Sequence, residues 1–375
     1  MNTLRVLAVG DPAISVYTDK SVQGISSRWE YEFNAKVQYE VLPWEQYHSV
    51  VDSAVKERKE TLDIIMVAGH LWLADFVESE IIIPLPDKLD QDILPNARRE
   101  SLYKEKEYLV PSFSDGHLVF YRRDILGDLP AVMSPIDMVK AAMSAKRDVV
   151  AYPLALKAHR SEIFLDFLPY LRAYGEEPFD SEGRWVAHRK EVVDALNYYT
   201  GLRALTPFNV HTYGNEEVCR ALQTGEVGMA VSWGGQAVTI VNGFSDTVRE
   251  KVGFSTLTRP WNVNWSFAIT AFSQQKEIAF SYLKYITGNN GDRKIGEVAG
   301  SPMRLATYLD NAENQVCPWY PYQLEMLNRA VPLPTFVGAR KTLGVVYEHL
   351  FEAFMAKITP EQFYDRCDQD INENS

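Results

Sequence analysis

The sequence predicts an α/β protein built from two domains. Its 375 residues exceed the roughly 100 to 200 of one typical domain, and 46% of them are hydrophobic, which is enough for packed cores. From the N-terminus onward, short apolar runs that end at glycine or proline alternate with longer stretches of helical spacing. This alternation favours a mixed, largely parallel sheet with helices packed against it.

Three strand–helix pairs open the chain. Predicted strands cover residues 4–9, 36–42 and 63–68, and predicted helices cover residues 22–33, Trp44–Lys56 and 72–79. The third strand, DIIMVA, is apolar almost throughout, which predicts burial on both of its faces. We expect Gly69, His70 and Leu71 to form its exit turn.

The later elements follow the same logic. Predicted strands cover residues 227–232, Val252–Leu257 and 266–270, and predicted helices cover residues 162–174 and 191–205. Residues 179–185 predict a hairpin turn with Gly183 at positive φ. Thr359, Pro360 and Gln362 suit the N-cap, first turn and capping box of a last helix. Turn-rich breaks at 111–116 and 260–264 are predicted domain crossings, and 289–292 is a predicted loop.

Composition excludes several classes of partner and site. The net charge is −12, from 38 Lys plus Arg against 50 Asp plus Glu, and no basic block stands out. Nucleic acid or an anionic membrane surface is therefore not expected as a partner. The three cysteines have no zinc spacing, and no apolar run reaches the roughly 18 residues of a membrane span. The N-terminus lacks the features of a signal peptide, so either the protein is cytoplasmic or an export signal precedes this sequence.

Motifs for common chemistry are missing from the sequence. It has no P-loop, no dinucleotide fingerprint, no HExxH and no GxSxG. Tyr198 and Tyr199 are adjacent, a pairing that can ligate ferric iron, but helical spacing turns them about 100° apart and favours core packing. We therefore expect no catalytic residue, no metal and no cofactor.

Aromatic residues at turns are the main candidates for ligand binding. Trp233 ends the strand 227–232 and precedes Gly234 and Gly235, which allow another surface to approach closely. Flat ring faces at such a position suit the apolar faces of sugar rings, although a Trp that plugs a domain edge would look the same. Four more tryptophans lie in or beside turn-rich segments: Trp44, Trp72, Trp261 and Trp265.

Polar candidates lie at strand ends. Asp11 follows the first strand, and Gly69 and His70 follow the third, where backbone and side chains are placed to meet ligand hydroxyls. Asp115 lies in the first crossing and is expected to bridge to a ligand hydroxyl. His70 as a surface turn residue and Asp115 as a turn cap remain the alternatives.

Seven motifs follow one another along the sequence: WEQY, DIIMVAGHLW, YLVPSFSDGHLVFYRRDIL, FDSEGRW, LQTGEVGMAVSWGGQA, WSFAIT with KEIAFSYLKYIT, and GSPMR. In this order they resemble the extracellular solute-binding proteins of ABC importers, in the sugar-binding branch called family 1. Leu62 stands where the family has Pro, and Val263 and Asn264 stand where it has a double Gly before the cleft Trp, here Trp265. The resemblance makes Arg304 of the last motif a further candidate for ligand binding.

The resemblance implies a type II periplasmic-binding-protein-like fold, with two α/β lobes, a hinge and an interlobe cleft. Lobe one would comprise 1–111 and 259–305, and lobe two 112–258 and 306–375. Such a protein captures a sugar or oligosaccharide and delivers it to membrane permease subunits without chemistry. We accordingly expect an extracytoplasmic monomer, periplasmic or lipid-anchored, whose export signal lies upstream of Met1.

Two alternatives stay open at the level of sequence. A glycoside-processing enzyme needs paired carboxylates, and Asp11 and Asp115 are the candidates for that pair. An import binder for a non-sugar ligand, such as iron or a polyamine, would share the same fold. A few loop residues decide the ligand, and the sequence does not identify it.

Overall fold

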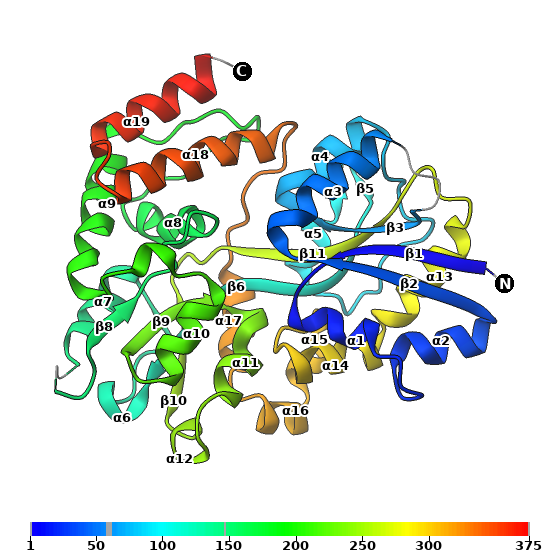
Figure 1. Ribbon diagram of the computed structural model, residues 1–375, viewed down its shortest axis with the longest axis horizontal. Helices are drawn as coiled ribbons and strands as arrows, with labels where there is room; N and C mark the ends of the chain where they lie inside the picture. Colours follow the sequence, from blue (N-terminus) through cyan, green and yellow to red (C-terminus); the bar gives the residue numbers. More distant parts are fainter. Residues whose placement is uncertain (1, 58–61, 146–147, 374–375) are drawn as a thin grey trace. The chain divides into compact units, whose positions relative to one another are not determined.

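The structure is a computed structural model that describes residues 2–57, 62–145 and 148–373. The chain divides into two compact units, of residues 1–115 with 263–320 (unit 1) and 116–262 with 321–375 (unit 2). The predicted lobes changed at 111/112, 258/259 and 305/306, whereas the units change at 115/116, 262/263 and 320/321. Each unit is described separately below (Figure 1).

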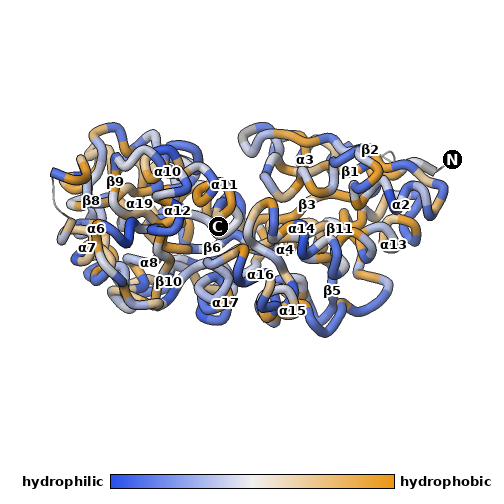
Figure 2. Tube along the Cα trace, turned by 90° about the horizontal axis from the view of Figure 1, so that it is seen from below, coloured by the Kyte–Doolittle hydropathy of each residue, from blue (hydrophilic) through white to orange (hydrophobic). Residues whose placement is uncertain are grey.

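Unit 1 is a sheet covered by helices. Its strands lie in the order β2 (Ala35–Leu42), β1 (Asn2–Val9), β3 (Ile64–Ala68) and β11 (Asn262–Ile269). β1 pairs in parallel with β2 and β3, and β11 runs antiparallel to β3. Every residue of β3 is buried, as its apolar sequence predicts, and hydrophobic segments follow β1 and β3 in Figure 2.

Helices connect and cover the strands of unit 1. They are α1 (Ser15–Thr18), α2 (Ile25–Phe33), α3 (Trp44–Lys56), α4 (Gly69–Glu78), α5 (Pro95–Glu100), α13 (Lys276–Ile286), α14 (Asn289–Val298), α15 (Leu305–Leu309) and α16 (Asn311–Val316). A two-stranded hairpin pairs β4 (Leu102–Tyr103) with β5 (Lys106–Glu107). α3 packs on β1 and α2 on β2.

Unit 2 contains a second mixed sheet. The strand β6 (Val110–Arg122) pairs antiparallel with β9 (Val227–Trp233) and with β10 (Val252–Leu257). β8 (Tyr152–Ala155) extends the sheet in parallel beside β9, and β7 (Val132–Met133) does so beside β10. The ends of β8 and β9 bring the principal candidate residues together.

Helices surround this second sheet. They are α6 (Arg123–Leu126), α7 (Pro135–Met143), α8 (Ile163–Ala173), α9 (Arg189–Gly201), α10 (Asn215–Gln223), α11 (Ala237–Asn242), α12 (Asp246–Arg249), α17 (Tyr320–Arg329), α18 (Ala339–Phe354) and α19 (Pro360–Asp368). α8 packs against α9 and α18, and α19 packs against α9 and α18. Tyr199 of α9 is buried and Tyr198 is half-buried, so the two side chains do diverge.

Local signals were reliable where neighbouring residues decide the geometry. Phe179 and Trp185 form an antiparallel bridge around Gly183, whose φ is +82°. Thr359 caps α19 by accepting from the Gln362 N–H, and the Gln362 side chain accepts from the Thr359 N–H. Both confirmed predictions rest on side chains that bond within a few residues.

Three local predictions were wrong. Residues 111–116 form no turn, because β6 runs unbroken beside β11 and its residues 110–121 are buried, which overrides their turn propensity. Residues 289–292 begin α14 rather than a loop, with Gly291 packed closely against the Ile286 carbonyl. Gly69 to Leu71 form the first turn of α4, since a helix follows β3 at once.

The prediction of a largely parallel sheet was also wrong. Antiparallel pairs join β11 to β3 and β6 to both β9 and β10, and they are about as frequent as the parallel pairs. The difference arises because the long strand β6 runs opposite to both of its neighbours in unit 2, β9 and β10. Among the described residues, no helix combines the length and the apolar character that a membrane crossing requires.

Candidate ligand-binding residues

Trp233 lies at the end of β9, opposite His117 of β6 in the strand register. Its ring centroid is 5.1 Å from that of His117 and 5.5 Å from that of Trp261. Trp261 directly precedes β11 and donates its backbone N–H to His117 Nδ1 at 3.0 Å. These three rings therefore form one aromatic cluster in unit 2, in which Trp233 is only 5% exposed.

Polar groups hold the Trp233 ring on its remaining sides. The Lys157 ammonium lies 3.7 Å from the ring centroid, a short cation–π distance. Trp233 Nε1–H donates to Glu162 Oε2 at 3.0 Å, and the same oxygen lies 3.7 Å from Lys157 Nζ. Lys157 also donates to Asn215 Oδ1 at the start of α10. The orientation of the ring is thus set by one cation, one carboxylate and its aromatic neighbours.

Glycine at 234 serves close packing in this structure. A Cβ added there would lie 2.2 Å from the Gln323 side-chain nitrogen, so a larger residue fits only if the Gln323 amide of α17 moves. Gln323 is fully buried, and its amide nitrogen and oxygen find no hydrogen-bond partner among the described residues. In the Trp-Gly-Gly sequence, Trp233 is therefore the candidate for ligand binding, whereas Gly234 allows α17 to pack closely.

The electrostatics of the cluster favour a neutral His117. Burial, together with the positive charges of Arg172 and Lys157, lowers the pKa of His117 to about 3. The imidazole is therefore uncharged across the physiological range, and its Nδ1 accepts a hydrogen bond. Sequence reasoning missed His117, Lys157 and Glu162, which become neighbours of Trp233 only through strand pairing and the β8–α8 loop.

Three of the predicted tryptophans gather in unit 1. The ring of Trp44 lies 5.9 Å from that of Trp72 and 5.8 Å from that of Trp265, in edge-to-face arrangements. Phe113 stacks on Trp265 with centroids 6.4 Å apart. Trp72 is buried, whereas Trp44 and Trp265 are half-buried and present ring area to solvent. Residues from α3, α4 and β11 thus build one aromatic surface.

Two predicted carboxylates influence each other in unit 1. Asp11 accepts from the Ala13 N–H at 2.9 Å and begins a short 3-10 turn at Pro12. Burial raises the pKa of Asp11 well above its usual value, and the charge of Asp115 raises it further. Asp115 lies at the end of the unit-1 part of β6 and is 7% exposed. Asp11, just after β1, and Asp115, within β6, therefore lie close enough for their charges to interact.

The other candidates of unit 1 have clear packing roles. A Cβ added at Gly69 would lie 3.1 Å from the Glu100 carbonyl oxygen, so this helix start is tightly packed. Burial alone lowers the pKa of His70 to about 3, which keeps its ring neutral. Arg304 pairs with Asp90 and Asp92 and donates Nε–H to the Thr287 carbonyl at 2.9 Å. Its guanidinium is engaged within the lobe, which favours a structural role.

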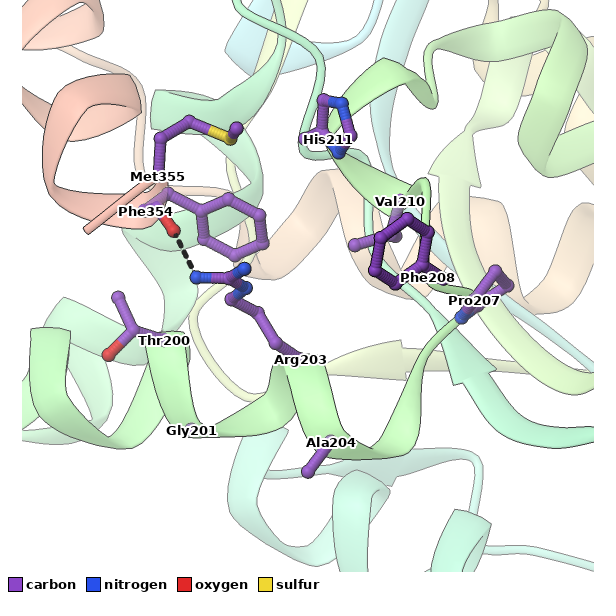
Figure 3. A pocket seen from close by; sticks show the side chains of 10 residues that line it. All are labelled: Thr200, Gly201, Arg203, Ala204, Pro207, Phe208, Val210, His211, Phe354 and Met355. Carbon is purple, nitrogen blue, oxygen red and sulfur yellow. Dashed lines mark hydrogen bonds between the residues drawn. The ribbon is translucent and has the colours of Figure 1, made fainter. Parts of the chain in front are cut away.

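Two hollows lie away from these residues. One, of about 390 Å³, lies in unit 2, where Phe354 and Met355 face Pro207, Phe208 and Val210 across Arg203 (Figure 3). The other, of about 680 Å³, flanks β1 and β2 in unit 1. As far as the described residues go, neither is lined by a residue that the sequence predicts to bind the ligand. In the same part of the chain, no group of three His, Cys, Asp or Glu is arranged to hold a metal ion.

Comparison with known proteins agrees with this architecture. The profile of the family "Bacterial extracellular solute-binding protein" matches residues 18–292. A probable amino-acid ABC transporter periplasmic-binding protein of Sinorhizobium fredii is 26% identical over 195 residues, which are 51% of this chain and 45% of that protein. A mannitol-binding protein of Pseudomonas aeruginosa is 24% identical over 294 residues, covering 73% of this chain and 67% of that protein.

The chain spans only 45% and 62% of the length of the first two curated relatives that it matches. Solved structures are matched over nearly their whole length. A maltose-bound MalE3 of T. maritima superposes with a TM-score of 0.87 at 20% identity, covering 100% of both chains. A solute-binding protein of Agrobacterium vitis S4 with bound D-mannitol gives 0.82 at 19% identity, covering 100% of this chain and 98% of that one.

These likenesses confirm the fold and the family that the seven motifs predict. The fold is the two-lobe fold of periplasmic binding proteins, formed here by the two α/β units. The family profile covers well over half of the chain and includes most of the motifs that carry the resemblance. This chain therefore belongs to the family of bacterial extracellular solute-binding proteins.

Proposed function

We propose that this protein captures a sugar or a sugar alcohol outside the cytoplasm and delivers it to the permease subunits of an ABC importer. It acts as a monomer, without a cofactor and without chemistry on its ligand. The family membership and the fold shared with maltose- and mannitol-bound proteins support this proposal. An export signal upstream of Met1, with or without a lipid anchor, belongs to the same proposal.

The aromatic cluster of unit 2 carries the proposal. Trp233 ends a strand and lies beside hydrogen-bonding groups that are already fixed, namely Glu162 and His117. Apolar ring faces flanked by oriented polar groups are what a sugar site requires, because a sugar has apolar faces and a rim of hydroxyls. Trp261 completes the same cluster.

Unit 1 contributes the second set of contacts in this proposal. The half-buried rings of Trp44 and Trp265 supply further apolar area, backed by Trp72. Asp11 and Asp115 accept hydrogen bonds from ligand hydroxyls. Gly69 and Gly234 allow close packing at Glu100 and Gln323, Arg304 is held by Asp90 and Asp92, and His70 stays a candidate contact.

Hydrolysis of a glycoside is the second candidate function, because Asp11 and Asp115 influence each other's charge. The raised pKa of Asp11 would suit a general acid. Membership of a family of solute-binding proteins favours binding over catalysis. Incubation with maltose and longer oligosaccharides separates the two, since an enzyme releases products and a binding protein returns the ligand intact.

A calorimetric screen tests the proposed function directly. The panel holds maltose, D-mannitol, ribitol, D-glucose, longer oligosaccharides and, as a contrasting class, the amino acids. We expect one or more sugars or sugar alcohols to bind in the micromolar range, which corresponds to about −8 kcal/mol. Saturable binding of amino acids alone, with no response to any sugar or sugar alcohol, would contradict the proposal.

A further inference from the structure

Strand β2 forms the outer edge of the sheet in unit 1. It is the terminal strand, so its pairing with β1 uses only one side of its backbone. The Leu42 carbonyl accepts from the Gly10 N–H on the β1 side. Because the backbone direction alternates along a strand, Val37, Tyr39 and Val41 direct their N–H and C=O groups outward. Such an edge is a template for pairing with another strand.

Two charged side chains close this edge at Val37. Glu30 Oε1 of α2 accepts from the Val37 N–H at 2.7 Å, and Lys20 Nζ donates to the Val37 carbonyl at 3.1 Å. The two side chains also pair with each other at 3.4 Å. Lys20 and Glu30, the edge guard, therefore occupy the donor and the acceptor that a neighbouring strand would use at this residue.

The edge beyond Val37 is open to solvent. Within the described residues, the outward N–H and C=O groups of Tyr39 and Val41 have no protein partner. Tyr39 is half-buried and Val41 is 41% exposed. The guard thus acts at one residue in the middle of an edge that is otherwise able to pair.

The occupant that fits this edge is the same edge of a second copy of the chain. Two identical edges pair antiparallel about a two-fold axis, and residues whose groups point outward have to face each other. The register that places Ala35 opposite Val41 and Val37 opposite Tyr39 meets this condition along the whole edge. With the guard in place, the central pairs of this register cannot form and only the terminal ones remain.

Side-chain charges favour the same register. Lys36, Gln38 and Glu40 alternate with the outward-directed residues, and all three are exposed. The register that pairs Val37 with Tyr39 also places Lys36 of one copy opposite Glu40 of the other. Opposite charges that face each other across a strand pair stabilise it. The edge is therefore complementary to itself in both backbone and charge.

We propose that Lys20 and Glu30 keep this protein monomeric by blocking antiparallel pairing of β2 with β2 of a second copy. The inference rests on the monomer of the proposed function and is independent of the ligand. Loss of the guard frees the Val37 N–H and C=O groups, which leaves an edge that pairs over its whole length. Charged side chains, lysine above all, are a common protection of sheet edges.

A guard variant that combines Lys20→Ala with Glu30→Ala tests the inference without a change of net charge. Static light scattering measures its average mass at protein concentrations up to about 500 µM, because self-association follows mass action. We expect the wild type to stay monomeric and the guard variant to rise toward twice the monomer mass. Lys190→Ala with Asp194→Ala removes another exposed lysine–carboxylate pair, on α9, and should stay monomeric.

Two further changes, each made in the guard variant, identify the surface that pairs. Val41→Pro puts a ring where the outward N–H was, so it should block the paired strand and restore the monomer. Glu40→Lys sets lysines opposite each other and should weaken the dimer by about tenfold or more. A dimer that persists in the Val41→Pro background would come from another surface and would overturn the inference.

Single variants serve if the guard variant does not fold. Glu30→Ala should speed hydrogen exchange of the Val37 amide by about tenfold or more, whereas Glu30→Gln keeps an acceptor and should not. Equal exchange in both variants would overturn the inference, as would a folded guard variant that stays monomeric. A dimeric wild type would overturn the inference together with the proposed monomer. Capture of a sugar is judged separately by the calorimetric screen.

Discussion

At the scale of single residues, Trp233 is a candidate for ligand stacking that also proves to be a packed residue, two readings that the sequence presents as alternatives. It lies at a strand end as a ligand-stacking ring should, yet it is only 5% exposed and packs against His117, Trp261 and Lys157. A variant at this position therefore affects binding and stability together. Two variants are needed to separate binding from packing: one that removes the aromatic ring, and one that keeps an aromatic ring but removes the Nε1–H bond to Glu162.

Trp233→Ala should weaken sugar binding at least tenfold and also lower the free energy of unfolding by about 3–5 kcal/mol, because a buried ring is lost. Trp233→Phe is the matched variant. It keeps an aromatic face and removes the bond to Glu162, so binding should stay within about threefold while stability falls by roughly 1 kcal/mol. Calorimetry and urea unfolding measure the two effects. Equal losses of affinity in both variants would mean that the ring face does not meet the ligand.

A second single residue, Asp166, makes the stability of the protein depend on pH. Burial raises its pKa to about 6 from an ordinary value near 3.8, so the folded state holds this proton more tightly than the unfolded state. Between about pH 4 and pH 6, the folded chain binds more protons here, and its stability falls as the pH rises. We expect Asp166 to contribute a fall of about 3 kcal/mol across this window.

Urea unfolding of Asp166→Asn at several pH values checks this expectation. The amide does not titrate, so the free-energy difference between variant and wild type should shift in favour of the variant as the pH rises from 4 to 6. Asp128→Asn changes an exposed carboxylate and should show no comparable shift. Parallel pH profiles for wild type and Asp166→Asn would contradict the assigned pKa.

At the scale of elements, the approach of α17 to the backbone after β9 constrains the turn that carries Trp233. A Cβ at residue 234 would lie 2.2 Å from the Gln323 amide, and one at residue 116 would meet the Met326 side chain at 2.5 Å. Both glycines belong to unit 2 and face the same helix. Gly234, next to Trp233, and Gly116, next to Asp115, therefore allow α17 to pack closely beside the candidate residues.

Gly234→Ala should cost about 1–3 kcal/mol of stability, because the added methyl group overpacks against Gln323. In a Gln323→Ala background the same change should cost clearly less, since the two side chains compete for one space. Gly201→Ala is the control, because no described heavy atom lies within 4 Å of its added Cβ. Thermal unfolding of the four combinations gives the coupling, and a purely additive result would show that Gly234 does not require this contact.

At the scale of the whole molecule, the chain passes from one unit to the other three times, at 115/116, 262/263 and 320/321. The first crossing lies within β6, the second within β11 and the third at the start of α17, so strands and a helix rather than loose linkers connect the units. Short crossings of this kind are suited to a hinge in which a few residues absorb the change of φ and ψ. Ligand-driven closure is the expected motion.

Saturation with a bound sugar should lower the radius of gyration in small-angle scattering and change the tryptophan emission, because closure buries surface near several rings. Trp233→Ala, measured at a sugar concentration about equal to the wild-type Kd, should stay close to the larger radius of the free protein, because most of the variant is then unliganded. A saturating sugar that leaves both the scattering and the emission unchanged would count against a closing two-lobe binder.

The sequence alone determined the features that neighbouring residues control. The buried strand β3, the hairpin around Gly183 and the capping box of Thr359 all follow from periodicity or from hydrogen bonds within a few residues. The ordered motifs likewise predicted the family and its two-lobe fold. These signals need no knowledge of which distant segments meet.

Only the tertiary structure decided what depends on long-range packing. β6 continues through Pro111 to Gly116 because its burial beside β11, a strand far away in sequence, outweighs local turn preference. Lys157, Glu162 and His117 meet Trp233 because β8, β9 and β6 pair side by side, and no local pattern records that pairing. The physical reason is that contact energies between distant residues exist only once the chain has folded, whereas local propensity is present in every short segment.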